Sequence, residues 1–244
     1  MRIKGWFDYL RHRDAKLSAW QRQNPSRPLR EFYAERAERK LRKGRPHRTL
    51  GGKMLNRKFG ISGKSFFDQL VEYGLKPEDV CADYGCGTLR IGIHLIEYLE
   101  PGRYWGLDVS NFLLDRGREL IGGRLLAEKR PNLRVISEAA VDEVAAAKPR
   151  LLVSNRVLNH VQPEELGEYF NHIMRIIGAS GQAVVTGKWS TGETRPIRKG
   201  KSWAYALPTL REQVEAEGGR MEILMENADG EIMNGAFRIE RRTP

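Results

Sequence analysis

Short apolar segments alternate with helical segments from residue 80 to the end of the chain, and this alternation constrains the fold most strongly. The pattern predicts strands at 80–84, 104–107, 133–136, 151–154 and 182–186. It predicts helices between or after them at 88–98, 111–126, 141–146, 163–177 and 207–216. Strands that alternate with helices form crossover units and build a mainly parallel sheet with helices on its faces.

The last part of the chain departs from this alternation. Two strands are predicted in succession, at 221–226 and 231–239, with a turn at Asp229-Gly230 between them. An Asp-Gly pair between two such runs is typical of a β-hairpin. We therefore expect an α/β fold whose mainly parallel sheet ends in an antiparallel hairpin at its edge.

The first quarter of the chain has a different organisation. Helices are predicted at 6–20, 28–43 and 64–73, with Pro28 near the start of the second and Gly44 just past its end. A glycine-rich linker is expected at 44–63. The chain is thus predicted to consist of a helical N-terminal extension, residues 1–60, and one larger domain, residues 61–244.

The charge of the chain is concentrated in this extension. Residues 1–60 contain 18 basic and 5 acidic residues, whereas the whole chain has a net charge of +11, so the remainder is close to neutral. A basic segment joined to a near-neutral domain indicates an anionic partner, such as nucleic acid, a lipid surface or an acidic substrate. A solvated, arginine-rich helical face is the alternative.

Several classes of protein are disfavoured by composition. No apolar run reaches the roughly 18 residues that a membrane span needs, and the N-terminus lacks the apolar region of a secretory signal. Cys81 and Cys86 are too few for a disulfide framework. We expect a cytoplasmic protein without a transmembrane segment, and peripheral membrane contact stays open.

The stretch 81-CADYGCGTLR-90 follows the first predicted strand of the domain. In parallel sheets, ligands bind beyond the carboxyl ends of the strands, so this loop lies where a ligand is expected. The loop lacks the Gly-x4-Gly-Lys-Ser/Thr pattern that binds triphosphates. It begins like the dinucleotide fingerprint Gly-x-Gly-x-x-Gly, but Arg90 stands in place of the third glycine, which argues against NAD.

Two acidic residues narrow the choice of ligand. A carboxylate at Asp83, beside the glycines, would repel a pyrophosphate and favour a cationic ligand. Asp108 ends the next strand, in GLDVS, 21 residues after Gly87, where an acidic residue suits the hydroxyls of a ribose. A ribose joined to a positively charged, non-phosphate group matches S-adenosylmethionine.

Three motifs in order carry a family resemblance. DYGCG, GLDVS and LLVSNRVLNHV together resemble the class I S-adenosylmethionine-dependent methyltransferases, over about residues 62–240. The resemblance implies a methyltransferase with a Rossmann-like, seven-stranded mixed sheet whose last strand is antiparallel. It also implies S-adenosylmethionine as the cofactor.

The resemblance assigns cofactor-binding roles to particular residues. The loop residues Asp83, Gly85 and Gly87, with Cys86 between the glycines, would shape the site of the methionine moiety. Asp108 would hold the ribose. The other implied contacts are Val109 on the adenine, Glu138 and Ala139 near its amino group, and the Asn155 backbone under the methionine. At Glu138 the family more often has Asp. Arg90 either pairs with an anionic group in the site or is a tolerated surface residue.

The chemistry of transfer points to a histidine. An oxygen nucleophile of high pKa needs a general base, and the family often has His where His160 stands. His160 is therefore the candidate base or substrate ligand, and a structural histidine is the alternative. Some relatives place Glu before this His as part of a metal site, but this chain has Asn159, so we predict no metal.

An insertion after the fifth strand, residues 187–206, is expected to contact the acceptor. It combines aromatic and basic residues, of which Trp189, Arg195, Trp203 and Tyr205 are the candidate substrate-binding residues. Such a mixture suits a sugar or a base that carries an anionic group. A flexible basic lid is the alternative.

The favoured function is methyl transfer to a small polar acceptor, most simply O-methylation of a saccharide or another anionic small molecule. One alternative is an RNA methyltransferase that uses residues 1–60 as a nucleic-acid arm. Another is a partner protein that binds the cofactor without turnover. The sequence does not fix the oligomeric state.

Overall fold

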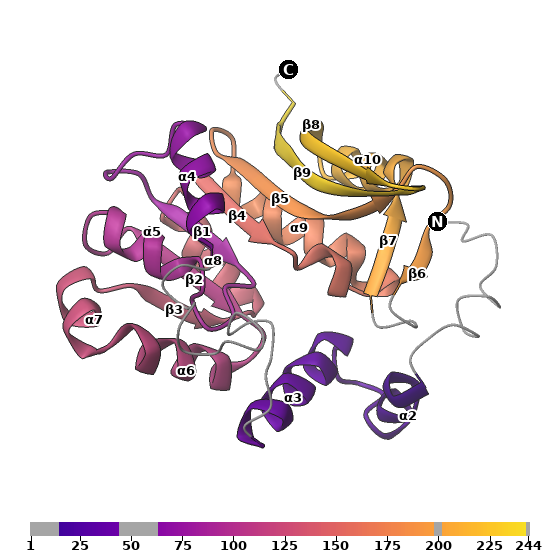
Figure 1. Ribbon diagram of the computed structural model, residues 1–244, viewed down its shortest axis with the longest axis horizontal. Coiled ribbons are helices and arrows are strands. Elements are labelled where there is room, and N and C mark those ends of the chain that lie inside the picture. Colours follow the sequence, from indigo (N-terminus) through magenta and orange to yellow (C-terminus); the bar gives the residue numbers. More distant parts are fainter. Residues whose placement is uncertain (1–14, 44–62, 198–201, 243–244) are drawn as a thin grey trace. The chain divides into compact units, whose positions relative to one another are not determined.

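The computed structural model of the protein describes residues 15–43, 63–197 and 202–242 (Figure 1). These residues form two compact units. The described residues within Met1–Phe32, Ser154–Met174 and Gln182–Pro244 form unit 1, and those within Tyr33–Val153 and Arg175–Gly181 form unit 2. The predicted boundary near residue 60 and the predicted linker lie outside the described residues. No helix of the described ranges is both long and apolar enough to cross a membrane.

Unit 2 is built on parallel strands. These are β1 (Cys81–Tyr84), β2 (Tyr104–Asp108), β3 (Asn132–Val135) and the first three residues of β4 (Leu151–Asn155). Hydrogen bonds join them in the order β3-β2-β1-β4. All four residues of β1 are buried, as expected of a central strand covered on both faces. The predicted parallel arrangement is thus confirmed.

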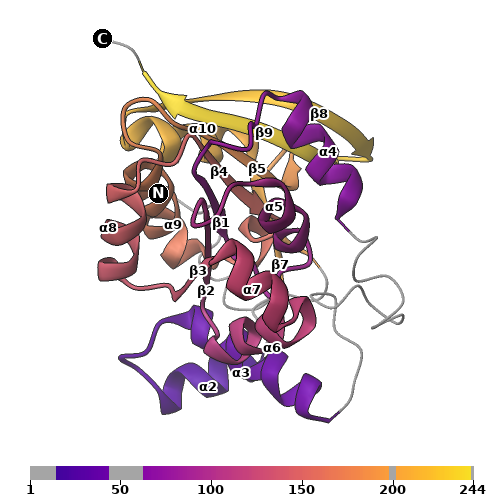
Figure 2. The same ribbon diagram turned by 90° about the vertical axis from the view of Figure 1, so that its left-hand side faces the viewer.

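Helices cover both faces of these strands. They are α4 (Lys64–Glu72), α5 (Gly92–Tyr98), α6 (Asn111–Ile121), α7 (Gly123–Lys129) and α8 (Glu138–Ala146). Figure 2 shows α5, α6 and α7 on one face and α8 on the other. Serine side chains cap two of them, since Ser110 accepts from the Leu113 amide at 3.3 Å and Ser137 from the Ala140 amide at 3.2 Å.

Two helices of unit 2 differ from their predicted ranges. The segment predicted as one helix at 111–126 is divided into α6 and α7, because Gly122 takes φ 82° and ψ 154°, outside the helical region. The helix predicted from residue 88 begins only at Gly92. The residues before it form an irregular loop, described below.

Unit 1 contains the end of β4 and a mostly antiparallel set of strands. These are β5 (Gln182–Ser190), β6 (Arg195–Ile197), β7 (Ser202–Ala206), β8 (Gly219–Asp229) and β9 (Ile232–Arg241). β9 pairs antiparallel with β5 along its whole length and with β8, and the hairpin turns between Asp229 and Ile232. The predicted C-terminal hairpin and antiparallel last strand are confirmed.

The sheet has more strands than the predicted seven. Hydrogen bonds join nine strands among the described residues. The two additional strands, β6 and β7, come from the insertion at 187–206, which also lengthens β5 to Ser190. β7 pairs parallel with the end of β5, and β6 pairs antiparallel with β7.

The helical segments of unit 1 come from three parts of the chain. They are α2 (Ala15–Gln23), the start of α3 (Leu29–Arg42), the 3-10 turns η2 (Leu158–His160) and η3 (Pro163–Glu165), most of α9 (Leu166–Ile177), and α10 (Leu207–Ala216). Residues 6–14 of the first predicted helix lie outside the described residues.

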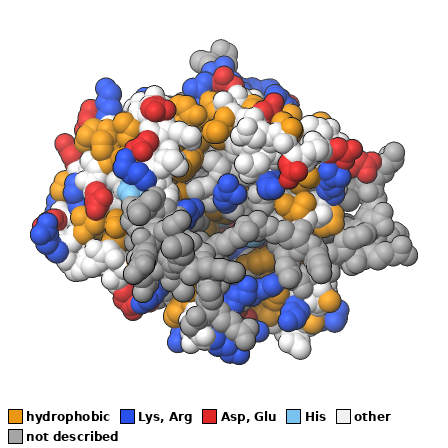
Figure 3. All heavy atoms as spheres, viewed as in Figure 1, with side chains coloured by type: hydrophobic (Ala, Val, Ile, Leu, Met, Phe, Trp, Pro, Cys, Tyr) orange, Lys and Arg blue, Asp and Glu red, His pale blue; other side chains and the backbone are white. Residues whose placement is uncertain are grey.

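In the space-filling view, Lys and Arg side chains of the described residues are interspersed with Asp and Glu (Figure 3).

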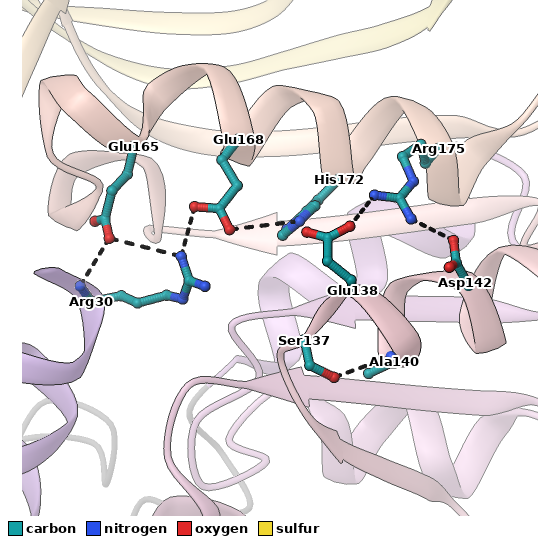
Figure 4. Close-up of polar contacts among 9 residues, drawn as sticks. All are labelled: Arg30, Ser137, Glu138, Ala140, Asp142, Glu165, Glu168, His172 and Arg175. Atoms are coloured by element: carbon teal, nitrogen blue, oxygen red, sulfur yellow. Dashed lines mark hydrogen bonds and ion pairs between the residues drawn. The ribbon is translucent and has the colours of Figure 1, made fainter. Parts of the chain in front are cut away.

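A carboxylate from a distant segment caps the start of α3 (Figure 4). Glu165 accepts a hydrogen bond from the Arg30 backbone amide at 3.1 Å, and the Arg30 guanidinium donates to Glu168 at 2.7 Å. Burial raises the pKa of Glu165, and the amide and charge of Arg30 oppose this rise. A carboxylate at a helix N-terminus satisfies free amides and interacts favourably with the helix dipole. This contact anchors the first turn of α3 within unit 1.

We therefore predict that Glu165→Ala loosens the first turn of α3. The loss of a capping side chain costs about 1 kcal/mol, so amide hydrogen exchange at residues 29–32 should accelerate several-fold. Glu212→Ala, an exposed glutamate on α10, is the matched control. Unchanged protection of α3 in the Glu165 variant would contradict the anchoring role.

Candidate functional site

The loop between β1 and α5 has an unusual backbone. Gly85 (φ 81°), Gly87 (φ 58°) and Leu89 (φ 62°) all adopt the left-handed conformation, in alternate positions. The amides of Gly85 and Cys86 both donate to the carbonyl of Leu107, at 2.7 and 3.0 Å. The loop is therefore tightly curved and attached to the end of β2.

Leu89 is the unexpected member of this series. A non-glycine residue in the left-handed region carries strain on the order of 1–3 kcal/mol. Its side chain is fully buried, and the absence of side chains at Gly92 and Gly117 makes room for it. A Cβ at Gly117 would lie 2.8 Å from Leu89 Cγ. In the dinucleotide fingerprint, the third glycine falls at the position of Arg90. In this loop the third residue with a left-handed backbone is instead Leu89.

Asp108 is joined to this loop by a hydrogen bond. Its carboxylate accepts from the Gly87 amide at 2.8 Å through Oδ2 and from the Ser110 amide at 3.0 Å through Oδ1. The side chain is only 6% exposed, and this burial raises its pKa to about 6, although backbone amides oppose the rise. Since a carboxylate has about four acceptor positions, both oxygens can accept further hydrogen bonds.

Asp83 is the residue before the last one of β1, two residues before Gly85. It is 2% exposed, and its Oδ2 accepts from the Tyr104 hydroxyl at 2.9 Å. Burial, and to a smaller extent the charge of Asp108, raise its pKa to about 7, whereas the Tyr104 hydrogen bond and the charge of Arg90 lower it. Two buried carboxylates in one site are unfavourable when both are ionised, so the site favours a cation.

The two cysteines do not supply reactive thiolates. Cys81 and Cys86 are buried and free. Burial, and then the charge of Asp83, raise the pKa of both thiols well above the usual value. A thiol that stays protonated is a poor nucleophile. Cys86 contributes a small side chain to the loop.

The other predicted cofactor residues of unit 2 differ in burial and in their partners. Arg90 is half-buried, and its charge is close enough to Asp83 to lower the pKa of that carboxyl. Val109 is half-buried beside Asp108. Glu138 and Ala139 are exposed at the start of α8, and Glu138 pairs with Arg175 at 2.5 Å (Figure 4). The Ile136 amide donates to the carbonyl of Asp108 at 3.0 Å, which brings the end of β3 to this site.

In unit 1, the end of β4 carries a second group of predicted residues. Asn155 accepts from the Thr186 hydroxyl at 2.5 Å. Arg156, which the sequence analysis missed, is exposed and left-handed (φ 61°), and its amide donates to the carbonyl and the hydroxyl of Thr186, both at 3.1 Å. His160 is exposed at the end of η2.

Asn159, the residue before His160, holds this turn in place. Its amide nitrogen donates to the carbonyls of Lys188 and Trp203, both at 2.7 Å. Its carbonyl oxygen accepts from the Lys188 amide at 2.9 Å. These contacts fix η2 against β5 and β7, and they give Asn159 a structural role.

The aromatic residues of the insertion are buried within unit 1. Trp189, Trp203 and Tyr205 are at most 2% exposed. Trp203 donates to Gln162 at 3.2 Å, and Tyr205 donates to the carbonyl of Val161 at 2.8 Å. These side chains therefore pack in the core and offer no exposed face to an acceptor, contrary to the role expected for them. Strand formation by the insertion explains the difference.

Of the basic residues of the insertion, some are described by the structure and others are not. Arg195 pairs with Glu231 at 2.8 Å and is partly exposed. Arg198, Lys199 and Lys201 lie outside the described residues. The expectation of a basic acceptor surface therefore depends on Arg195 in the described part of the insertion, and its charge is already paired there.

No family model matches the sequence, and no curated protein matches it. Solved structures match its fold. Magnesium protoporphyrin IX methyltransferase from Synechocystis PCC 6803, with bound SAM, aligns with a TM-score of 0.60 at 15% identity over 88% of this chain and 95% of its own. Geranyl diphosphate methyltransferase, in complex with GPP and sinefungin, gives 0.56 at 11% over 73% and 78%.

A third match differs in activity. The cyclase SpnF aligns with a TM-score of 0.55 at 12% identity, over 74% of this chain and 82% of its own. These identities establish the fold alone. The chain has the fold of class I S-adenosylmethionine-dependent methyltransferases, as the three sequence motifs led us to expect.

The two buried carboxylates predict a pH dependence of stability. Both pKa values are raised above the ordinary 3.8, so the folded ligand-free protein binds more protons than the unfolded chain. The free energy of unfolding should therefore decrease as pH rises from about 4 to 7. Asp83→Asn removes one ionisation and keeps an acceptor for Tyr104.

Urea unfolding measures this free energy. Between pH 5 and pH 7.5, the free energy of unfolding of the wild type should decrease by about 2 kcal/mol more than that of Asp83→Asn. Asp68→Asn, an exposed position on α4, should follow the wild type. Parallel pH profiles for wild type and Asp83→Asn would contradict the raised pKa of Asp83.

Proposed function

We propose that this protein is an S-adenosylmethionine-dependent methyltransferase that acts on a small polar acceptor. The observation that carries the proposal is the site of unit 2, where a left-handed glycine loop follows the buried Asp83 and donates a hydrogen bond to the buried carboxylate of Asp108. A site with this charge disfavours phosphate ligands and favours a cationic nucleoside.

The residues present fit this cofactor. Asp108 is fixed by two backbone amides and keeps acceptor positions for ribose hydroxyls. Asp83 supplies a negative charge suited to the sulfonium or ammonium group, and the conformations of Gly85 and Gly87 allow a close approach of the backbone. We assign Arg90, whose charge is close enough to Asp83 to lower the pKa of that carboxyl, to the carboxylate of the methionine moiety. The contacts inferred for Val109, Glu138 and Ala139 in unit 2 are part of the same proposal, and the backbone contact of Asn155 with the methionine moiety stays an expectation from the family resemblance.

The cofactor would supply an electrophilic methyl group on a positively charged sulfur. The protein's own task is then to orient the acceptor and to remove its proton. We assign proton removal to His160, which is exposed on a turn that Asn159 holds by three hydrogen bonds. A fixed turn keeps a general base in one position through the reaction.

We further propose that the acceptor is anionic, a saccharide acid or a similar small molecule, methylated on oxygen. Support comes from Arg156, which is exposed at the end of β4, where parallel sheets bind ligands. Its strained backbone is maintained by two hydrogen bonds from its amide to Thr186. Strain of this kind is concentrated at functional positions, and a guanidinium there would pair with a carboxylate or phosphate.

The activity needs a direct test because one protein of the same fold is a cyclase. A protein that binds the cofactor without turnover would show affinity for S-adenosylmethionine but no methyl transfer to any acceptor. An RNA methyltransferase would bind mixed RNA at low salt, with an affinity that falls steeply as salt rises. An assay for S-adenosylhomocysteine formation, read out as homocysteine after enzymatic hydrolysis, over sugars, sugar acids, hydroxy acids and RNA separates these possibilities.

Asp108→Ala should weaken S-adenosylmethionine binding by roughly 1–3 kcal/mol, because ribose hydroxyls would lose a buried acceptor. Isothermal titration calorimetry measures this directly. Asp115→Ala, an exposed carboxylate on α6, should bind as the wild type does. Equal affinity of the Asp108 variant and the wild type would count against the cofactor assignment as a whole.

His160→Ala should leave cofactor affinity unchanged and lower turnover with the acceptor found in the screen by about 10²–10⁴-fold. Glu164→Ala, an exposed neighbour, serves as the control. Full turnover in the His160 variant would make this histidine a structural residue.

A further inference from the structure

The phenol of Tyr104 is the feature of the site that the proposed function leaves unexplained. Tyr104 begins β2, is 2% exposed, and donates its hydroxyl to Asp83 Oδ2 at 2.9 Å. Other tyrosine hydroxyls of the chain donate to neutral acceptors, Tyr98 to the carbonyl of Leu75 and Tyr169 to the Ser154 hydroxyl. Tyr104 is instead directed to a carboxylate of the candidate site.

Sheet register explains how the phenol reaches this carboxylate. β1 and β2 run parallel, with Cys81 opposite Tyr104 and Asp83 opposite Gly106. Tyr104 and Gly106 are two residues apart and face the same side of the sheet. Because Gly106 has no side chain, the ring can extend past it toward Asp83.

Two glycines make the space that the ring occupies. A Cβ at Gly106 would lie 3.0 Å from Tyr104 Cε1, and a Cβ at Gly92 would lie 2.5 Å from the Tyr104 hydroxyl. The second distance is far below any normal contact, so a side chain at Gly92 would displace the hydroxyl. The two glycines, on β2 and α5, therefore permit the contact between Tyr104 and Asp83.

The charged groups around Asp83 give this contact a consequence. Asp108 raises the pKa of Asp83, Arg90 lowers it, and the thiols of Cys81 and Cys86 are the other titratable groups nearby. Burial favours the neutral acid most strongly. A hydrogen bond to the charged form opposes this effect, and Tyr104 donates one.

We propose that Tyr104 is a positioning residue whose hydroxyl keeps the Asp83 carboxylate ionised and oriented for the cationic end of the cofactor. This inference rests on the proposed function. In the free protein near neutral pH, part of the Asp83 population is protonated. Binding of a cation would convert that carboxyl to a carboxylate and release its proton to the buffer.

The test is calorimetry of S-adenosylmethionine binding between pH 5.5 and 9, in two buffers that differ in ionisation enthalpy. The wild type should bind more tightly as pH rises through about 7 and should release protons below that pH. S-adenosylhomocysteine has the same amino acid group without the sulfonium charge, so its affinity should depend less on pH. Titration of the ligand's own amino group is common to all variants and cancels in their comparison.

Tyr104→Phe removes only the hydroxyl. It should move the pH profile upward by roughly one unit, with about fivefold weaker binding at pH 7. Gly92→Ala should move the profile in the same direction, because its methyl group displaces the hydroxyl. Tyr98→Phe is the matched control and should keep the wild-type profile. In an Asp83→Asn background, Tyr104→Phe should have no effect on the pH dependence.

The outcomes separate this inference from the proposed function. If the wild type binds S-adenosylmethionine and Tyr104→Phe binds it with an unchanged pH profile and unchanged proton release, Tyr104 has only a packing role and the inference is wrong. If the wild type binds no S-adenosylmethionine at any pH, the proposed function itself is wrong. A Tyr104→Phe protein that fails to fold leaves Gly92→Ala to decide, by the same pH profile.

Discussion

The hydrogen bond from the Gly87 amide to the Asp108 carboxylate connects the two parts of the chain on which the candidate site depends. It joins the glycine loop after β1 to the end of β2, where the Leu107 carbonyl also accepts two loop amides. Three backbone donors therefore fix the loop against the next strand. The carboxylate that would bind a ribose is thereby oriented before any ligand arrives, which lowers the entropy lost on binding.

Burial of the carboxyl groups of Asp83 and Asp108 determines the electrostatic preference of the site. Removing two carboxylates from water is unfavourable unless donors or a cation compensate. Here the donors are backbone amides for Asp108 and a phenol for Asp83, with Arg90 as the nearby cation. These donors offset only part of the cost of burying the two carboxylates, so burial raises the pKa values of both carboxyls. A positively charged ligand would stabilise the ionised form of both carboxylates.

Small residues make this arrangement possible. The strained backbone of Leu89 is tolerated because its side chain is fully buried where Gly92 and Gly117 leave room. Gly92 and Gly106 leave room for Tyr104 in the same way. Gly92 therefore contributes to both contacts, so the packing of α5 on the sheet and the environment of Asp83 depend on one another.

In unit 1, strand formation by the insertion removes its aromatic residues from the surface. Trp203 and Tyr205 donate hydrogen bonds to the segment just after His160, and Asn159 binds β5 and β7. The insertion therefore supports the turn that carries the candidate base. Exposed residues at the end of β4, Arg156 among them, are left as the groups available to an acceptor.

The sequence by itself determined the alternation of strands and helices, the C-terminal hairpin, the glycine loop and the two carboxylates, since each depends on local periodicity or on spacing along the chain. Only the tertiary structure decided which side chains are buried. Aromatic residues at 189, 203 and 205 suit an exposed platform or a core equally well, and pairing of β5 with β7 places them inside. The contact between Tyr104 and Asp83, and the strained conformation of Leu89, depend on glycines from other elements. No local pattern contains that information, because these contacts exist only after the strands and helices have packed.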